Sequence, residues 1–195
     1  MQFTVMSLAI CVLTSMGLTG PVSNYFSPQR GRAKPVELLA VHERVLRMWL
    51  KTHPDLRPAQ MGDCEDVTID SSGKEHKESC QRLLNDLRAT SKNPNASPFY
   101  VKGDFNGDGS EDFAVVLTKT SSAKSGARPA TVAVFNGPFP KGAPVDPAFL
   151  LTRKSVSETF LFYGFPRKKP WRLVISLPES EGHAVLWQNG KYVLR

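Results

Sequence analysis

Oxygen-bearing side chains recur at alternate positions of one short segment, residues 104–112. Ca²⁺ takes about six to eight oxygen ligands, and a chain that turns sharply around the ion offers it a side chain from every second residue. A glycine at the sixth position of the segment permits the backbone angles that such a turn needs. The segment therefore predicts a calcium site. Its expected ligands are the side chains of Asp104, Asn106, Asp108 and Asp112 and the backbone carbonyl of Ser110.

The residues after this segment exclude an EF-hand. An EF-hand places a bidentate Glu at the twelfth loop position, which here is Val115, and continues into a helix. Residues 113–118 are instead β-branched or apolar, which predicts a buried strand. A second strand is expected over Phe99–Val101, so the calcium segment is predicted to join two strands of a hairpin.

With Phe105 at its second position, the pattern D-x-N-x-D-G-x-x-D resembles the calcium-binding loop of FG-GAP and VCBS-type repeats, which occur in integrin α-chain propellers and in many secreted bacterial proteins. The resemblance covers residues 99–118 and implies Ca²⁺ as the ligand. No internal repeat of about 40–50 residues accompanies it, so a complete propeller is not expected. Functions that depend on a propeller therefore do not carry over to this chain.

A loop without metal is the alternative for the same residues. Asp and Asn side chains accept hydrogen bonds from nearby backbone N–H groups in Asx-turns, and such turns need no ion. Three carboxylates in a short loop repel one another unless a cation neutralises them, which favours the calcium site. Glu111 lies between ligand positions and is expected to be a solvated charge.

The beginning of the chain favours export. Residues 1–20 contain no charged side chain and include an apolar stretch, Val5–Leu13, that is too short to span a bilayer. We interpret them as a signal peptide, which predicts a secreted or periplasmic protein, and a chain that is not exported is the alternative because no basic residue precedes the apolar stretch. Removal of this segment leaves Cys64 and Cys80, and an even number of cysteines in an exported chain predicts one disulfide. Two buried thiols are the alternative.

The rest of the chain predicts a linker and one domain. Residues 21–34 lack periodicity and are expected to be a flexible linker, and residues 35–195 are expected to form a single calcium-binding domain. Apolar residues at helical spacing predict a helix between Pro35 and His53, and the capping box of Ser72 and Glu75 predicts the start of a second helix. Strands are expected at 67–69, 99–101, 113–118, 131–135, 149–151, 159–163, 171–177, 184–187 and 192–194.

These elements predict an α+β fold in which two N-terminal helices pack on one face of a mostly antiparallel sheet of about seven strands. The Asn189-Gly190 dipeptide predicts a tight hairpin turn between the last two strands. The segment 54–72, which contains two prolines and a glycine, is expected to be mostly loop.

The charge of the chain and the motifs that it lacks limit the classes of function that the sequence supports. The net charge of +7 comes from short basic clusters, which favour a solvated face or an anionic surface over nucleic acid. The sequence contains no Gly-x-Ser-x-Gly, no Walker loop, no dinucleotide fingerprint and no paired metal-binding histidines. The expected function is a non-enzymatic exported calcium-binding protein, with no transmembrane helix in the mature chain, in which Ca²⁺ stabilises a hairpin loop of a partner-binding or structural domain.

Two other function classes stay open. The first is a cell-envelope interaction or inhibitor module that binds a protein partner through residues 119–129 and 137–147 and through the aromatic residues Tyr163, Phe165 and Trp171. Core packing of these aromatic side chains is the simpler interpretation. The second is an enzyme whose site assembles in space, for example a pocket that joins His183 to a carboxylate.

Overall fold

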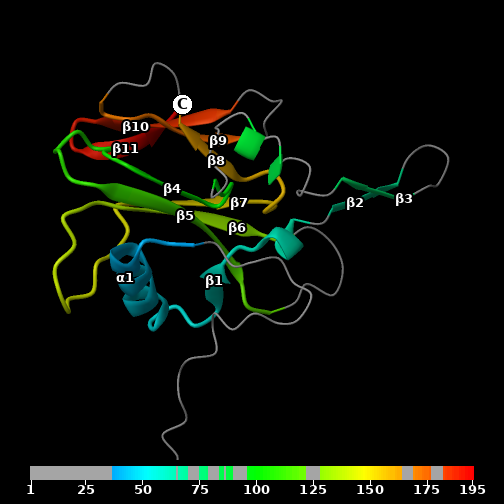
Figure 1. Cartoon of the computed structure of the whole chain (residues 1–195), viewed down its shortest axis with the longest axis horizontal. Coiled ribbons are helices and arrows are strands. Elements are labelled where there is room, and N and C mark those ends of the chain that lie inside the picture. Colours follow the sequence, from blue (N-terminus) through cyan, green and yellow to red (C-terminus); the bar gives the residue numbers. More distant parts are fainter. Residues whose placement is uncertain are drawn as a thin grey trace, which may run out of the picture.

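Strands dominate the computed structural model, which describes residues 37–64, 66–69, 75–78, 84–85, 87–89, 96–121, 128–163, 169–176 and 182–195. The strands form a five-stranded sheet, a four-stranded sheet and a separate two-stranded hairpin (Figure 1). The elements in chain order are α1 (Ala40–Leu50), β1 (Leu56–Pro58), the 3₁₀ helix η2 (Met61–Asp63), β2 (Asp66–Ile69), β3 (Glu75–Glu78), β4 (Tyr100–Gly103), β5 (Asp112–Lys119), β6 (Ala130–Phe135), β7 (Phe149–Arg153), β8 (Phe160–Tyr163), β9 (Leu173–Ser176), β10 (His183–Gln188) and β11 (Lys191–Leu194).

Both main sheets are antiparallel. In the larger one the order is β1-β5-β6-β7, and β4 also pairs with β5. The two short strands share one edge of β5, since β1 pairs with its second half and β4 with its first half. The smaller sheet has the order β11-β10-β9-β8. Its last hairpin turns at Asn189 and Gly190, whose φ angles of 51° and 76° are those of a type I′ turn, so this prediction is confirmed.

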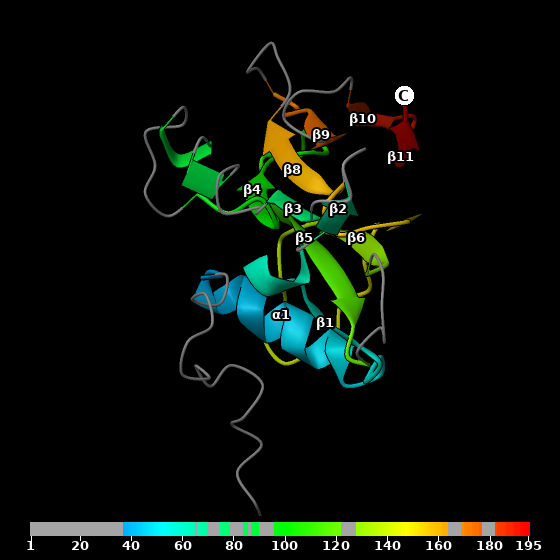
Figure 2. The same cartoon turned by 90° about the vertical axis from the view of Figure 1, so that its right-hand side faces the viewer.

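The central strand β5 is apolar on both faces because it lies between two layers. Phe113, Val115 and Leu117 pack in the cluster that contains the side chains of α1. Ala114 and Val116 point the other way, into the cluster shared with β8, β9, β10 and β11. Figure 2 shows the result, with α1 on one side of β5 and the smaller sheet on the other. A continuous apolar run is what a strand covered on both faces requires.

Helix α1 confirms the first predicted helix. Val45, Leu46 and Trp49 are buried, and Trp49 packs edge-on against Phe135 with 5.9 Å between the ring centroids. The helix begins five residues later than Pro35, because Leu39 still has an extended backbone with ψ of 143°.

The predicted α+β fold with two helices on a single sheet is wrong. Among the described residues only α1 is a helix of seven or more residues, and the strands form two main sheets. Successive apolar residues of β5 point to opposite faces of the larger sheet, so both faces must be buried. Helix α1 covers one face, and the smaller sheet covers the other. The sequence pattern located most of the strands but missed β1 and β3, and it did not divide the strands between sheets.

The second helix was predicted to start in a segment that forms a hairpin. Strands β2 and β3 pair in antiparallel register, from Asp66 opposite Glu78 to Ile69 opposite Glu75. Two competing local patterns explain the error. The Ser72–Glu75 capping box favours a helix, whereas a β-branched strand followed by Ser-Ser-Gly favours a turn and a return strand. Residues 84–85 and 87–89, later in the predicted helix, do have helical backbone.

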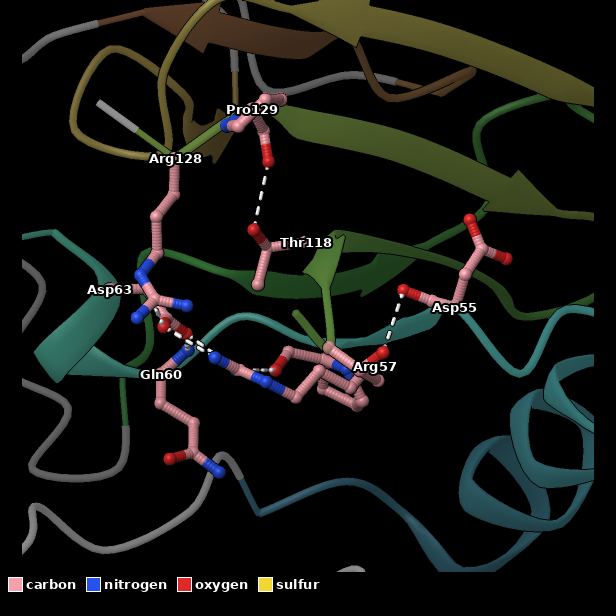
Figure 3. A network of polar contacts seen from close by, with 9 residues as sticks. Asp55, Arg57, Gln60, Asp63, Thr118, Arg128 and Pro129 are labelled. Atoms are coloured by element: carbon pink, nitrogen blue, oxygen red, sulfur yellow. Dashed lines mark hydrogen bonds and ion pairs between the residues drawn. The ribbon is translucent and has the colours of Figure 1, made fainter. Parts of the chain in front are cut away.

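The predicted loop 54–72 contains β1 and η2, and a buried carboxylate holds the two together. Both side-chain oxygens of Asp63 accept hydrogen bonds from Arg57 at 2.6 Å, and Oδ2 also accepts one from the backbone N–H of Gln60 at 2.8 Å. Arg128 adds an ion pair at 3.5 Å. Figure 3 shows Arg57 and Arg128, from distant parts of the chain, converging on Asp63. Bidentate charge-assisted bonds of this kind fix geometry as well as charge.

Several predictions fall on residues that the structure does not describe. The signal peptide at 1–20 and the linker at 21–34 lie outside the described residues. Cys64 is buried directly after η2, whereas Cys80 is not among the described residues, so their disulfide stays a prediction. No helix in the described part of the chain has the length and apolar character needed to cross a membrane.

Candidate metal site

The predicted calcium segment is the connection of the β4–β5 hairpin, as expected. Gly103 pairs with Asp112, so residues 104–111 form the loop between the two strands. Phe105 is 1% exposed and lies in the core cluster between the two sheets. The loop is therefore fastened to the core at its second residue and continues into β5 at its far end.

Asp104 is the centre of the first half of the loop. Its carboxylate is nearly buried and accepts hydrogen bonds from the backbone N–H of Gly107 at 2.7 Å and of Gly109 at 3.2 Å. Both glycines have positive φ, at 80° and 89°, in the region that favours glycine over other residues. The backbone thus wraps around Asp104 with its N–H groups turned inward.

Asn106 and Asp108 form two consecutive Asx-turns. Asn106 Oδ1 accepts a hydrogen bond from the Asp108 N–H at 3.0 Å, and Asp108 Oδ1 accepts one from the Ser110 N–H at 2.7 Å. Asn106 Nδ2 also donates to Asp108 Oδ2 at 2.9 Å. The bond from the Ser110 backbone, followed by the bond from Asn106, lowers the pKa of Asp108. Asp108 is exposed, so its carboxylate is charged and open to solvent at neutral pH.

Asp112 is fully buried and joins three parts of the backbone. Its Oδ2 accepts hydrogen bonds from the N–H groups of Phe105 at 2.8 Å and Asn106 at 3.2 Å. Its Oδ1 accepts one from the Gly137 N–H at 2.9 Å, in the segment that follows β6. Burial raises the pKa of Asp112, and the three N–H donors oppose that effect. Asp112 thus ties both ends of the loop together and fastens them to a third segment.

Three neighbours of the loop come from the second half of the chain and were missed by sequence reasoning. The Lys169 Nζ lies 3.4 Å from Asp104 Oδ2, and the Trp171 N–H donates to the Asp104 carbonyl at 2.8 Å. Tyr192 in β11 donates to Asn136 Oδ1 at 2.6 Å, and its pKa is raised by burial and then by the carboxylates of the loop. The only sequence pattern at Lys169 is a basic cluster, interpreted as a solvated face.

The donor set fits a hard cation by chemistry, since every candidate side chain offers oxygen and each Asp108 carboxylate oxygen keeps a lone pair beside the one hydrogen bond it accepts, whereas Asp112 Oδ2 already accepts two. Over the residues that the structure describes, no three His, Cys, Asp or Glu side chains already form a group that could hold a metal. Asp104 and Asp108 instead face N–H donors. The structure therefore places the predicted ligands on one loop without gathering them around one point.

A second polar cluster lies on the face of the hairpin that α1 covers. His42 is 1% exposed, and its Nδ1 is 2.8 Å from the Tyr100 hydroxyl. Its Nε2 lies 3.7 Å from Glu111, which also pairs with Lys102 at 3.0 Å. Burial lowers the pKa of His42 to about 4, against a smaller opposing effect of Glu111. His42 is therefore neutral at pH 7 and shielded from any substrate.

Comparison of the chain with models of protein families, with curated protein sequences and with solved structures gives no match. The resemblance to FG-GAP and VCBS-type loops therefore depends on the loop residues alone. The function has to be argued from the geometry of the loop and its surroundings.

Proposed function

We propose that residues 104–112 bind one Ca²⁺ ion, and that this ion is a structural staple of the β4–β5 hairpin in an exported, non-enzymatic domain. The proposed ligands are the side chains of Asp104, Asn106, Asp108 and Asp112 with the Ser110 carbonyl. The observation that carries the proposal is the charge of the loop. Two of its three ligand carboxylates, those of Asp104 and Asp112, are buried, and the Lys169 ammonium group lies 3.4 Å from Asp104. An excess of negative charge at a desolvated site favours a bound cation.

The backbone also supports the proposal. Two positive-φ glycines already give the loop the tight turn around Asp104 that a calcium loop needs. Asp108 is exposed and Asn106 is half-buried, and their side chains make hydrogen bonds within the loop, so the ion can gather them without moving the core. Binding of an ion to the folded state alone stabilises that state by mass action.

A structural ion suits this loop better than a regulatory one. Asp112 fastens the loop to Gly137, and Trp171 fastens it to the segment before β9. A sensor needs an element with two comparably stable arrangements, whereas these buried bonds favour one. The same argument separates the domain from a switch whose backbone rearranges on binding calcium.

A protein-interaction module finds less support in the aromatic residues that suggested it. Tyr163 and Trp171 contact each other edge-on at 5.0 Å and pack against the core between the sheets. Tyr163 also donates from its hydroxyl to the Lys102 carbonyl at 2.6 Å. Phe165 and residues 122–127 lie outside the described part of the chain.

Calorimetric titration of the full chain tests the proposal. Ca²⁺ is expected to bind at one site and to bind more tightly than Mg²⁺, because a flexible cage of protein oxygens suits the larger ion. Asp108→Asn is expected to weaken binding strongly, and Asp146→Asn, an exposed carboxylate outside the loop, is the matched control. A chain that binds no Ca²⁺, or an Asp108→Asn variant that binds as tightly as the control, overturns the proposal.

A further inference from the structure

We infer that a cavity beside the calcium loop binds a small ring that carries a carboxylate, and that Lys169 couples this binding to calcium. The cavity has a volume of about 200 Å³ and lies between Phe105 of the loop, the segment 169–172 and residues 186–188 of β10. The coupling rests on the proposed calcium site, whereas the cavity itself does not.

The indole rings of Trp171 and Trp187 form two walls of the cavity, and contacts with the rest of the protein hold both rings in place. Trp171 packs so closely on Gly103 that a Cβ atom there would lie 2.5 Å from its ring, and its backbone N–H is bonded to the Asp104 carbonyl. Trp187 packs edge-on against Tyr192, with 4.8 Å between the ring centroids. Both indoles are only partly buried although they pack against the core. Rigid, half-exposed aromatic walls offer a flat apolar ligand a preformed surface.

The rim of the cavity is positively charged. Lys169 and Arg172 line it together with the amide of Gln188, and none of the described residues that line it is acidic. The Lys169 side chain is 63% exposed, so its ammonium can reach either Asp104 or the cavity. A negatively charged group on the ligand therefore finds a cation at the rim, and a planar carboxylate can accept two parallel hydrogen bonds from an arginine.

The size of the cavity limits the occupant to one ring. Pockets for drug-sized ligands usually have volumes of roughly 300–1,000 Å³, and this one is smaller. The ligand must also place an apolar face against an indole and its carboxylate at the rim. A sugar acid and an aromatic acid share this chemistry, so the experiment uses one probe of each kind.

Lys169 links the cavity to the calcium loop because one ammonium serves both. Its Nζ lies 3.4 Å from Asp104 Oδ2, a proposed calcium ligand. Ca²⁺ bound to Asp104 would replace Lys169 as the neutralising charge and release it toward the cavity. Calcium is therefore expected to raise the affinity for the carboxylate by about fivefold, at the lower end of typical couplings, and the ligand must raise the calcium affinity by the same factor.

Indole N–H resonances in NMR spectra of the full chain test this directly. Trp171 and Trp187 report on the cavity, and Trp49, a residue of α1 that is buried against the larger sheet, is the internal control. Glucuronate and benzoate are titrated beside their neutral counterparts, methyl glucoside and benzyl alcohol. Each titration is made with Ca²⁺ and with protein freed of calcium on a chelating resin, since soluble chelators carry carboxylates of their own.

At least one carboxylate probe is expected to shift the two cavity resonances and not that of Trp49, and its neutral counterpart is expected to bind more weakly. Glucuronate alone would identify a sugar acid, and benzoate alone an aromatic acid. Lys169→Gln is expected to weaken binding about fivefold and to remove the effect of calcium. Lys141→Gln, an exposed lysine outside the cavity, is expected to change neither.

The outcomes separate the two proposals. If neither carboxylate shifts the cavity resonances, or if the neutral rings bind as tightly, the cavity assignment is wrong even when the chain binds calcium. If calcium binds and the carboxylate affinity stays the same, the role of Lys169 is wrong. If carboxylates bind to a chain that takes up no calcium, the cavity assignment is supported and the calcium proposal is wrong.

Discussion

Protonation of His42 should destabilise the fold as the pH falls from 7 to 4. Burial lowers the pKa of His42 from 6.5 in the unfolded chain to about 4 in the folded one. The unfolded state therefore binds more protons in this range, so the stabilising contribution is complete above pH 6.5 and is lost toward pH 4. Each pKa unit corresponds to about 1.4 kcal/mol, so the loss approaches roughly 3 kcal/mol.

The His42→Phe variant isolates this contribution. A phenyl ring can keep the stacking on Phe113, whose centroid lies 4.5 Å from that of His42, but it cannot titrate. It also leaves the Tyr100 hydroxyl without the His42 partner, which should cost about 1–3 kcal/mol at pH 7. The double variant His42→Phe/Tyr100→Phe removes both polar side-chain groups and should recover part of that cost, because it also removes the hydrogen bond between the Tyr100 hydroxyl and the Leu39 backbone.

Urea unfolding of the three proteins between pH 7 and pH 4 supplies the measurement. Glu111 and Lys102, the charged groups that face His42, are the same in all three proteins, as are the other carboxylates. The free energy of unfolding of the wild type should therefore fall more steeply than that of either variant, by roughly 3 kcal/mol over the range. Parallel curves for all three proteins would refute the argument that His42 is held neutral by burial.

Three further substitutions test the packing of the loop and of the larger sheet. Gly103→Ala should lower the free energy of unfolding by about 1–3 kcal/mol, because its Cβ would lie 2.5 Å from the Trp171 ring, and thermal unfolding measures the loss. Asp63→Asn should cost about 2–3 kcal/mol in urea, since it weakens a partly buried bidentate ion pair, whereas Asp55→Asn at an exposed position should stay near zero. Asp112→Asn should destabilise the chain even without calcium, because three backbone N–H groups depend on its carboxylate, and hydrogen exchange at those amides should accelerate.

Local patterns in the sequence predicted the elements that depend on local chemistry. The apolar run 113–118 forms β5, and Asn189-Gly190 forms the predicted turn. Both could be predicted because the residues that define the periodicity of a strand, or a tight turn, are neighbours in the sequence. The loop between the strands at 99–101 and 113–118 was located for the same reason.

The division into two sheets depends on partners far apart in sequence and was not predictable from such patterns. The surroundings of Asp104 have the same origin, since Lys169 and Trp171 reach it from 65 and 67 residues away. A basic cluster gives no indication of which carboxylate it meets. The cavity likewise combines the loop with β10, and only the fold brings these segments together.

The melting temperature of the full chain, measured with Ca²⁺ and after removal of calcium, tests the central claim most directly. At a calcium concentration of about one hundred times the dissociation constant, a site present only in the folded state adds roughly 2.7 kcal/mol, which corresponds to about 5–10 °C for a chain of this size. The account predicts that increase for the wild type and for Asp146→Asn, and its absence in Asp108→Asn. A wild-type melting temperature that is the same with and without calcium would contradict it.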